Sequence, residues 1–162
     1  MMEEQKDMQA PRMPTLDTQL CFALYEASRA TIDIYRPFLD EIGITYPQYL
    51  VLLILWERGT CSVKEIGQLL HLDSGTLSPL LKRLEAAGFV HRQRRPTDER
   101  IVDISLSEQG QAIRERVAAL PEKFRCALEQ LDLSFEDYMS LFTGLKKLTR
   151  LLHSRTNTKS GR

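Results

Sequence analysis

Apolar residues recur every three or four positions over residues 15–42, and this spacing predicts an amphipathic helix. Thr15 is expected to cap the helix and Gly43 to end it. The stripe that we expect to be buried contains Leu16, Leu20, Leu24, Ala27, Thr31, Ile34 and Phe38. A second, almost wholly apolar helix should begin at Tyr46-Pro47, because proline is tolerated in a first helical turn, and end at Gly59. Its composition places it centrally in the core.

Two short helices with clear start signals follow. Ser62 and Glu65 have the spacing of a capping box, which predicts a helix over residues 63–70. Asp73 or Ser74 can cap the next helix, which should run to Ala87. The period then becomes alternating, so residues 89–94 and 101–106 are expected to be strands around a polar turn at 95–99. The buried face of the second strand should carry Val102, Ile104 and Leu106.

The rest of the chain predicts two more helices. Ser107 can cap a long helix through Leu131 that Pro121 interrupts, and Ser134 with Asp137 opens the last helix. The last helix has an apolar stripe of Tyr138, Leu141, Leu145, Leu148 and Leu152. The stripes of the first and last helices exceed what one small module can cover, which indicates a partner.

The predicted fold is mainly α with a small β-hairpin: a winged helix-turn-helix with N- and C-terminal dimerisation helices. Its parts are a flexible tail (1–14), an N-terminal helix (15–46), the winged helix-turn-helix domain (47–106), C-terminal dimerisation helices (107–153) and a basic tail (154–162).

Composition narrows the class of protein. The chain has 162 residues, 43% of them hydrophobic and 27% charged, which excludes a disordered or collagen-like protein. The longest apolar run, Tyr49 to Trp56, is too short to span a membrane. The polar first twenty residues do not resemble a signal peptide, and three cysteines do not make a secreted disulfide framework. We therefore expect a cytoplasmic, reducing setting and no membrane partner.

Charge distribution, rather than the net charge of zero, indicates nucleic acid. Residues 82–100 contain six basic and three acidic side chains, and the hairpin carries Arg92 among them. The small polar start of the helix after Asp73 can approach phosphates and base edges, and a basic hairpin tip fits a minor groove. Asp98 can pair with Arg100. The residues expected at the DNA are Ser74, Gly75, Thr76, Ser78, Pro79, Lys82, Arg83, Arg94, Arg95, Asp98 and Arg100.

The segment Asp98-Glu99-Arg100, followed by Val102, Ile104, Leu106 and Ser107, resembles the wing of MarR-type transcriptional regulators. The similarity extends from about Leu16 to about Leu152. It implies that the outer helices form a homodimer and that two winged modules bind a palindromic operator in double-stranded DNA.

Cys21 lies about 100° around the first helix from Leu20, which predicts a thiol at the flank of the buried stripe, shielded but reachable by a small oxidant. Tyr35 follows fourteen residues later on nearly the same side, but about 21 Å further along the axis. Within one straight helix the two side chains cannot touch. If they meet, the contact is across a dimer.

Three segments, residues 20–25, 44–50 and 72–77, resemble one branch of the MarR family, the organic hydroperoxide sensors. The resemblance implies a repressor of peroxide-resistance genes in which Cys21 is the peroxide-reactive thiol. It also implies that Tyr35 and Tyr46 of the other subunit hydrogen-bond to Cys21. Oxidation of a thiolate by peroxide gives a sulfenic acid. The aromatic side chains Phe22, Tyr25 and Phe38 would favour an organic peroxide as inducer.

Within this branch, Cys126 resembles the second cysteine of a two-cysteine subtype. The resemblance implies that Cys126 resolves the sulfenic acid as an intersubunit disulfide, which needs Cα atoms within about 7 Å. A one-cysteine mechanism, in which a small external thiol traps the sulfenic acid, stays open. Cys61 and the basic tail have no assigned role.

Two other functions compete with the peroxide-sensing repressor. One is a MarR-type repressor released by a small aromatic ligand. The other is a thiol peroxidase, which the sequence disfavours because no second acid–base group lies near Cys21 and no Cys-x-x-Cys pair is present. No Cys/His spacing indicates a metal site. We expect a regulator rather than an enzyme, with no cofactor and no metal.

Overall fold

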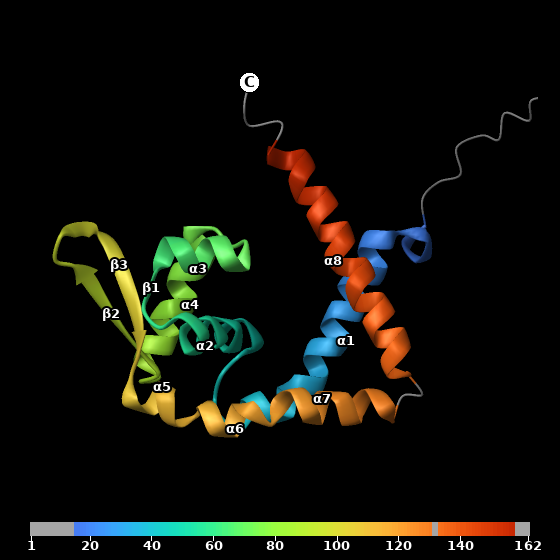
Figure 1. Ribbon diagram of the computed structural model, residues 1–162, viewed down its shortest axis with the longest axis horizontal. Helices are drawn as coiled ribbons and strands as arrows, with labels where there is room; N and C mark the ends of the chain where they lie inside the picture. The colour runs from blue at the N-terminus through green and yellow to red at the C-terminus, as the bar shows by residue number, and fades with distance from the viewer. Residues whose placement is uncertain (1–14, 131–132, 158–162) are drawn as a thin grey trace, which may run out of the picture.

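The computed structural model describes residues 15–130 and 133–157, so the predicted tail 1–14 lies outside the described residues. Residues 46–112 form a lobe of short helices and a small sheet, and the helices at residues 20–40, 120–129 and 135–157 form an arm joined to it (Figure 1). A 3-10 turn, Leu16–Thr18, precedes the first helix. The helices are α1 (Leu20–Asp40), α2 (Tyr46–Arg58), α3 (Val63–Leu70), α4 (Ser74–Ala86), α5 (Glu108–Ala112), α6 (Arg114–Ala118), α7 (Leu120–Glu129) and α8 (Phe135–Asn157), and the strands are β1 (Cys61–Ser62), β2 (Val90–Arg95) and β3 (Asp98–Leu106).

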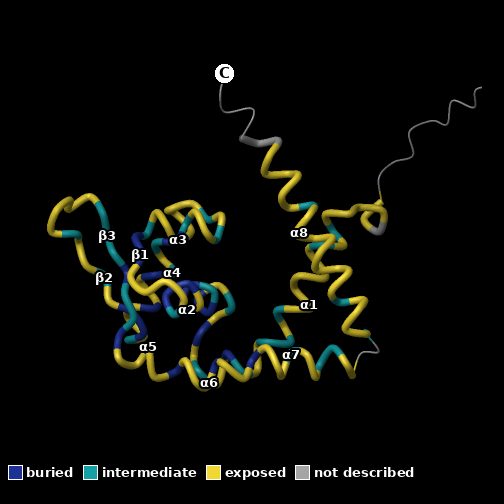
Figure 2. Tube along the Cα trace, viewed as in Figure 1, coloured by how far each residue is buried: buried dark blue, intermediate teal, exposed yellow. Residues whose placement is uncertain are grey.

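The core lies in the lobe, around α2. Val51, Leu52 and Leu55 of α2 are at most 1% exposed, which confirms the central position predicted for this helix. The inward faces of α4 and β3 close the core with Leu77, Leu81, Leu84 and Ile104. Buried positions are concentrated there, whereas α1 and α8 are mostly exposed (Figure 2). Because α2, α4 and β3 pack on one another through fully buried side chains, the outer surface of the lobe is held in a fixed geometry.

Local start signals are confirmed for the helices of the lobe. Ser62 and Glu65 form the predicted capping box of α3. Asp73, rather than Ser74, caps α4 by accepting the Thr76 backbone N–H. Ser107 caps α5. The expectation for Thr15 is wrong, since Gln19 holds the N-cap position of α1 and Thr15 precedes only the 3-10 turn.

The predicted hairpin gains a third strand. The sheet order is β1-β3-β2, with Cys61 paired to Ile104 and Val90 to Leu106. A two-residue strand such as β1 is too short for an alternating pattern, so the sequence did not predict it. At the turn both strands extend further than expected, which leaves a turn of Pro96 and Thr97, while β2 begins one residue later, at Val90. On the predicted inner face Ile104 is fully buried, while Val102 and Leu106 are half-buried.

The predicted burial of the α1 stripe is wrong for a single chain. Leu16 and Leu20 are 60% and 64% exposed, and on α8 Leu141 and Leu152 are 57% and 56% exposed. The expected long helix after Ser107 is three helices, α5, α6 and α7, and Pro121 lies in the first turn of α7, where it breaks no hydrogen bond. Leu131 lies outside the described residues. Helix α8 continues past residue 153, where the basic tail was expected to begin.

None of the helices in the described ranges is long and apolar enough to cross a bilayer.

Candidate DNA-reading surface and thiol site

Helix α4 presents its N-terminal turn on a concave surface of the lobe. The concavity has a volume of about 950 Å³ and is lined from α3, α4 and the hairpin, including His71, Ser74, Ser78 and Arg100. The first-turn residues Ser74, Gly75 and Thr76 are exposed. Further along α4, Ser78 is half-buried, and Pro79, Lys82 and Arg83 are exposed. The leucine face of α4 points into the core, so these polar residues face outward together.

The Asp73 cap organises the start of α4. Its carboxylate accepts the Thr76 backbone N–H at 2.9 Å and the Thr76 hydroxyl at 3.0 Å. These hydrogen bonds lower the pKa of Asp73. The Thr76 hydroxyl proton is therefore committed to Asp73, which leaves the hydroxyl oxygen of this exposed residue as an acceptor. The remaining N–H groups of the first turn suit a phosphate.

Two of the hairpin arginines lie at its tip with outward-facing groups. The Arg100 side chain is 95% exposed, and its backbone N–H donates to the Asp98 carboxylate at 3.1 Å. The Arg100 Nε lies 3.7 Å from the same carboxylate, which confirms the predicted Asp98–Arg100 pairing. Arg94 donates from its guanidinium to the Glu99 carbonyl at 2.9 Å, across the turn.

The other two hairpin arginines are turned toward carboxylates of the lobe. Arg95 donates to Asp103 from Nε at 2.9 Å and from a terminal nitrogen at 2.7 Å. Arg92 lies 3.5 Å from Glu85, with 23% of its side chain exposed. The Arg95 guanidinium thus makes two hydrogen bonds within the hairpin, although 39% of its side chain is exposed, and its contact with DNA stays a prediction. Sequence alone cannot distinguish an outward from an inward arginine on adjacent hairpin positions.

Cys21 is exposed on α1, in contrast to the shielded position that was predicted. Phe22 beside it is half-buried, and Tyr25 is 56% exposed and accepts a hydrogen bond from Arg29 at 3.3 Å. Phe38 is seventeen residues from Cys21, about 25 Å along the helix. It lies under the Lys123 ammonium at 4.1 Å. One chain therefore does not gather Phe22, Tyr25 and Phe38 around Cys21.

Tyr35 and Tyr46 come together in the same chain, with ring centroids 5.4 Å apart. Tyr49 completes the group at 6.3 Å from Tyr35 and 5.9 Å from Tyr46. Phe124 of α7 stacks on Tyr35 at 5.0 Å. Tyr49 and Phe124 were missed from the sequence. The i, i+3 spacing of Tyr46 and Tyr49 is a signal for the first, whereas Phe124 is brought in only by the tertiary fold.

The phenols of this group are strong candidates for hydrogen-bond donors. Burial, with a contribution from the neighbouring phenols, raises the pKa of Tyr35 to about 12. Burial also raises the pKa of Tyr46 and of Tyr49. All three phenols therefore keep their protons at neutral pH. Such O–H groups can donate to an anionic sulfur.

A cavity of about 230 Å³ adjoins Tyr35 between α1, α7 and α8. Its wall is mainly aromatic and aliphatic, with Phe124, Leu128, Phe135 and Tyr138, and Arg125 is among its lining residues. Arg125 forms ion pairs with Glu122 and Glu129 on the same helix. The cavity thus combines an apolar wall, a phenol and an ion-paired arginine.

The remaining cysteines have different surroundings. Cys126 is exposed on α7, and its thiol donates to the Glu122 carboxylate at 3.9 Å. It lies two residues after Phe124, about 200° around the helix, so it projects away from Tyr35. Cys61 is buried in β1, and burial raises the pKa of its thiol. Across the described ranges, no three His, Cys, Asp or Glu side chains gather as metal ligands.

Comparisons with known proteins agree with this geometry. A profile of the MarR family matches residues 44–102. The organic hydroperoxide resistance transcriptional regulator of Bacillus subtilis is 46% identical over 140 residues, which cover 86% of this chain and 93% of the relative. AbfR of Staphylococcus epidermidis has been solved in reduced form bound to DNA. That structure is 39% identical, covers 85% of this chain and 94% of its own, and has a TM-score of 0.70.

A second structure of AbfR, described as its disulfide form, is 37% identical, with coverages of 88% and 92% and a TM-score of 0.59. These likenesses run through the arm as well as the lobe, because they cover most of both chains. The polar first turn of α4, the basic hairpin tip and the three-stranded sheet fit the DNA-reading module of such regulators. The chain belongs to the MarR family of winged-helix, DNA-binding transcriptional regulators.

Proposed function

We propose that this chain is a dimeric repressor of peroxide-resistance genes, released from a palindromic operator when an organic hydroperoxide oxidises Cys21. The name of the B. subtilis relative links that protein to organic hydroperoxide resistance. The three segments that resemble the sensor branch contain Cys21, Tyr46 and the start of α4. In the proposed mechanism Cys21 reacts with the peroxide, Tyr46 donates a hydrogen bond to its sulfur, and the start of α4 binds DNA.

The exposed apolar stripes of the arm support a homodimer. Leu16 and Leu20 of the N-terminal segment and Leu141, Leu145 and Leu152 of α8 are between 37% and 64% exposed. Apolar surface of this extent indicates a partner. A second copy supplies the same stripes through a two-fold axis, which also places two α4 helices on successive major grooves.

The position of the tyrosines relative to Cys21 is the observation that carries the sensor proposal. Tyr35 and Tyr46 form one group, but α1 separates Cys21 from Tyr35 by about 21 Å in the same chain. A donor pair and its thiol can therefore meet only when the partner's α1 supplies the thiol. Each dimer would hold two such sites, each built from both subunits.

The chemistry follows from these groups. The Cys21 thiolate attacks the terminal oxygen of ROOH, the O–O bond breaks, and the sulfur becomes a sulfenic acid that keeps the hydroperoxide proton. The alkoxide takes a proton from solvent and leaves as the alcohol ROH. The Tyr35 and Tyr46 hydroxyls donate to the thiolate before attack. The thiol is consumed once per oxidation, so the protein acts as a regulator and not as a turnover catalyst.

Cys126 is the proposed resolving thiol. Its sulfur attacks the Cys21 sulfenic sulfur of the other subunit, a disulfide forms and water leaves. Since Cys126 projects away from Tyr35, the bond requires α7 to turn or shift. Helix α7 leads back through α6 and α5 to the sheet. Its movement would therefore change the distance between the DNA-binding lobes of the two protomers, which we call the reading heads.

Two alternatives make different predictions. A small external thiol would trap the sulfenic acid without using Cys126. A small aromatic ligand would fit the cavity beside Tyr35, whose apolar wall contains Phe124 and Phe135, and would release DNA without oxidation.

The test combines non-reducing gel electrophoresis with a DNA-binding assay before and after one equivalent of cumene hydroperoxide. Wild type, Cys21→Ser, Cys126→Ser and the matched control Cys61→Ser are compared. We expect a covalent dimer and loss of DNA binding in wild type and Cys61→Ser, and no covalent dimer in the other two.

Three other outcomes would each contradict one part of the proposal. Release of Cys126→Ser by peroxide together with an external thiol would replace the disulfide step with the one-cysteine mechanism. An unreactive Cys21 would reject peroxide sensing altogether. Repeated peroxide reduction with dithiothreitol, far faster than by free cysteine, would contradict the regulator assignment.

A further inference from the structure

The C-terminal half of α8 and the sequence after it carry basic side chains and no acidic ones. From Lys146 to Arg162 there are six Lys or Arg residues and no Asp or Glu. Lys146, Lys147 and Arg150 lie on α8 and are exposed. The acidic residues of this helix, Glu136 and Asp137, are confined to its first turn.

The helix dipole does not account for this distribution. Cations stabilise a helix C-terminus only within about the last turn. Helix α8 ends at Asn157, so Lys146 and Lys147 lie about three turns before its end. Lys146 also lies 5.9 Å from the Phe142 ring centroid, a contact that uses no acceptor, so both ammonium groups remain available to an anionic partner.

The end of α8 comes to the edge of the DNA-reading surface of its own chain. The His153 ring stacks on the His71 ring, with centroids 4.3 Å apart and planes 20° apart. His71 lies in the turn between α3 and α4 and lines the concavity that also contains Ser74 and Arg100. In Figure 1 the C-terminal end of α8, helix α3 and the hairpin tip all lie on the same side of the molecule, at the top of the view.

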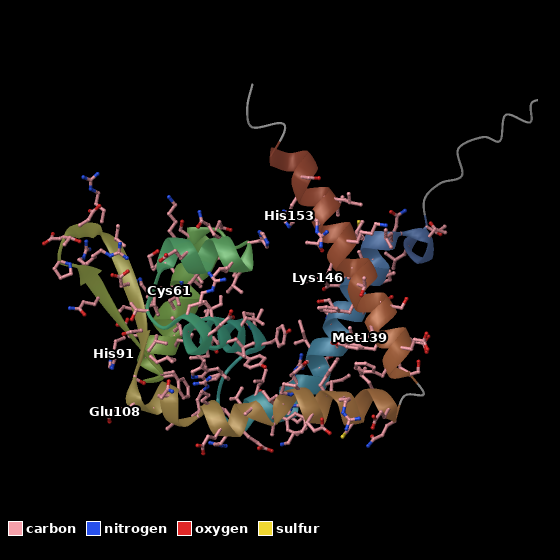
Figure 3. The ribbon with its side chains drawn as sticks, in the orientation of Figure 1. Cys61, His91, Glu108, Met139, Lys146 and His153 are labelled. Carbon is pink, nitrogen blue, oxygen red and sulfur yellow. The ribbon has the colours of Figure 1, made fainter. Side chains whose placement is uncertain are left out.

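Helical phase places two of the cations on the side of His153. Lys146, Arg150 and His153 are spaced i, i+4 and i+7, so they share one face of α8. The stack with His71 fixes that face toward the lobe. Figure 3 shows the labelled Lys146 and His153 on the side of α8 that faces α2 and α3. Two positive charges therefore line the side of the arm next to the reading head.

We propose that this face of α8, defined by Lys146 and Arg150 and flanked by Lys147, is a second DNA-binding surface that contacts the phosphate backbone at the centre of the operator. The inference rests on the dimer of the proposed function. In that dimer the arms lie at the two-fold axis, so both α8 ends come between the two α4 helices. The DNA that joins the two half-sites passes there.

The contact adds affinity and register but no base specificity, because phosphates carry no sequence information. It also links the arm directly to the operator. A shift of the arm would then weaken, in one step, the DNA contacts of the reading heads and the contact at the centre of the operator.

The experiment measures the dependence of the dissociation constant on salt for reduced, full-length protein. The probes are a fluorescent duplex selected from random sequence by the wild-type protein and a scrambled duplex of equal length. The variant is Lys146→Gln/Arg150→Gln, and the matched control is Arg114→Gln/Arg116→Gln, which removes two exposed charges from α6. A charge-preserving variant, Lys146→Arg/Arg150→Lys, serves as rescue.

Removing one phosphate contact lowers the slope of log K against log salt by about 0.9, so four contacts per dimer correspond to about 3.6. That change amounts to roughly a 100-fold difference in affinity between 50 and 200 mM salt. We expect it for the glutamine variant on both duplexes, with the rescue variant like wild type. A slope equal to that of the α6 control would overturn the proposal.

Hydroxyl-radical footprinting of wild type decides the question even if the variant does not dimerise. Protection of sugars between the half-sites supports the central contact, and full cleavage there rejects it. Cumene hydroperoxide is added as a separate arm. A wild type that stays bound after oxidation would reject the sensor proposal while leaving the salt slopes and the footprint as an independent answer.

Discussion

Arg95 and Asp103 are joined by two hydrogen bonds, from Nε at 2.9 Å and from a terminal nitrogen at 2.7 Å, across the two long strands of the sheet. The pair lies behind the hairpin tip, and Glu65 of α3 adds its charge near Arg95. A parallel, two-point contact fixes the orientation of both side chains. The pair therefore ties Arg95, the last residue before the turn, to Asp103 in the middle of β3 and holds this part of the hairpin in one geometry, beside Arg94 and Arg100.

Asp103→Asn should loosen the hairpin without unfolding the lobe. An amide cannot accept both arginine hydrogen bonds, so the amides of the hairpin should exchange hydrogen faster while those of α2 are unchanged. DNA affinity should fall equally on selected and scrambled duplexes, because a basic hairpin tip binds phosphates, which are the same in every sequence. The control is Asp33→Asn, which breaks an exposed ion pair on α1 with Arg36. Unchanged exchange in the hairpin would contradict the anchoring role.

The same pair should give the hairpin an acid limit. The hydrogen bonds from Arg95 hold the pKa of Asp103 below its ordinary value. A lowered folded pKa contributes stability above the ordinary carboxyl range, which is lost as pH falls through the folded pKa. We therefore expect wild type and Asp103→Asn to differ in hairpin exchange above about pH 4 and to converge below it. A difference that persists at about pH 2 would show that the carboxylate charge is not the cause.

Gly110→Ala should be strongly destabilising. A Cβ at this position would lie 2.0 Å from the Phe89 carbonyl oxygen, which is backbone and cannot yield. The Gly110 carbonyl also accepts the Trp56 indole N–H at 3.0 Å, so a shift would break a second contact. Overpacking of this kind costs about 1–3 kcal/mol or more. Urea denaturation checks the value, and Gly144→Ala, which meets nothing within 4 Å, should be neutral or slightly stabilising.

Tyr35→Phe should slow the reaction of the sensor thiol without weakening the fold. Phenylalanine keeps the stack on Phe124 but removes the hydroxyl, whose high pKa makes it a donor at neutral pH. A hydrogen bond to a charged group is worth about 1.5–3 kcal/mol, so the rate constant of Cys21 alkylation should fall about tenfold or more. Iodoacetamide labelling at several pH values measures it in the reduced protein. Tyr25→Phe is the control, and equal profiles for both variants would remove Tyr35 from the site.

Leu141→Glu/Leu152→Glu should separate the dimer. The two positions are eleven residues apart, on one face of α8, and both are more than half exposed in the single chain. Without the burial of two leucines from each protomer, the dimer dissociation constant should rise at least about 100-fold. Light scattering across a concentration series measures the change. The exposed Leu53 of α2 provides a control, since Leu53→Glu should remain dimeric.

Local sequence signals determined the reading head almost completely. Capping residues such as Ser62 and Asp73, the glycine after α4 and the alternating second strand act over three or four residues, so they predict element starts and types without tertiary information. The same local signals do not say what covers the apolar stripe of α1, which is mostly exposed in the single chain. A helical stripe shows that a surface is apolar, but its place in the chain does not say whether the same chain or a partner covers it.

The site depended on contacts between elements distant in the sequence. Sequence similarity named Tyr35 and Tyr46, but only packing brought in Tyr49 and Phe124 and raised the pKa of Tyr35. The hairpin shows the same division: the sequence supplied four arginines, and the fold paired Arg92 and Arg95 with carboxylates on other elements. Periodicity and caps are properties of a few neighbouring residues. The direction of a charge, the burial of a phenol and the face that meets DNA are set by which elements pack together.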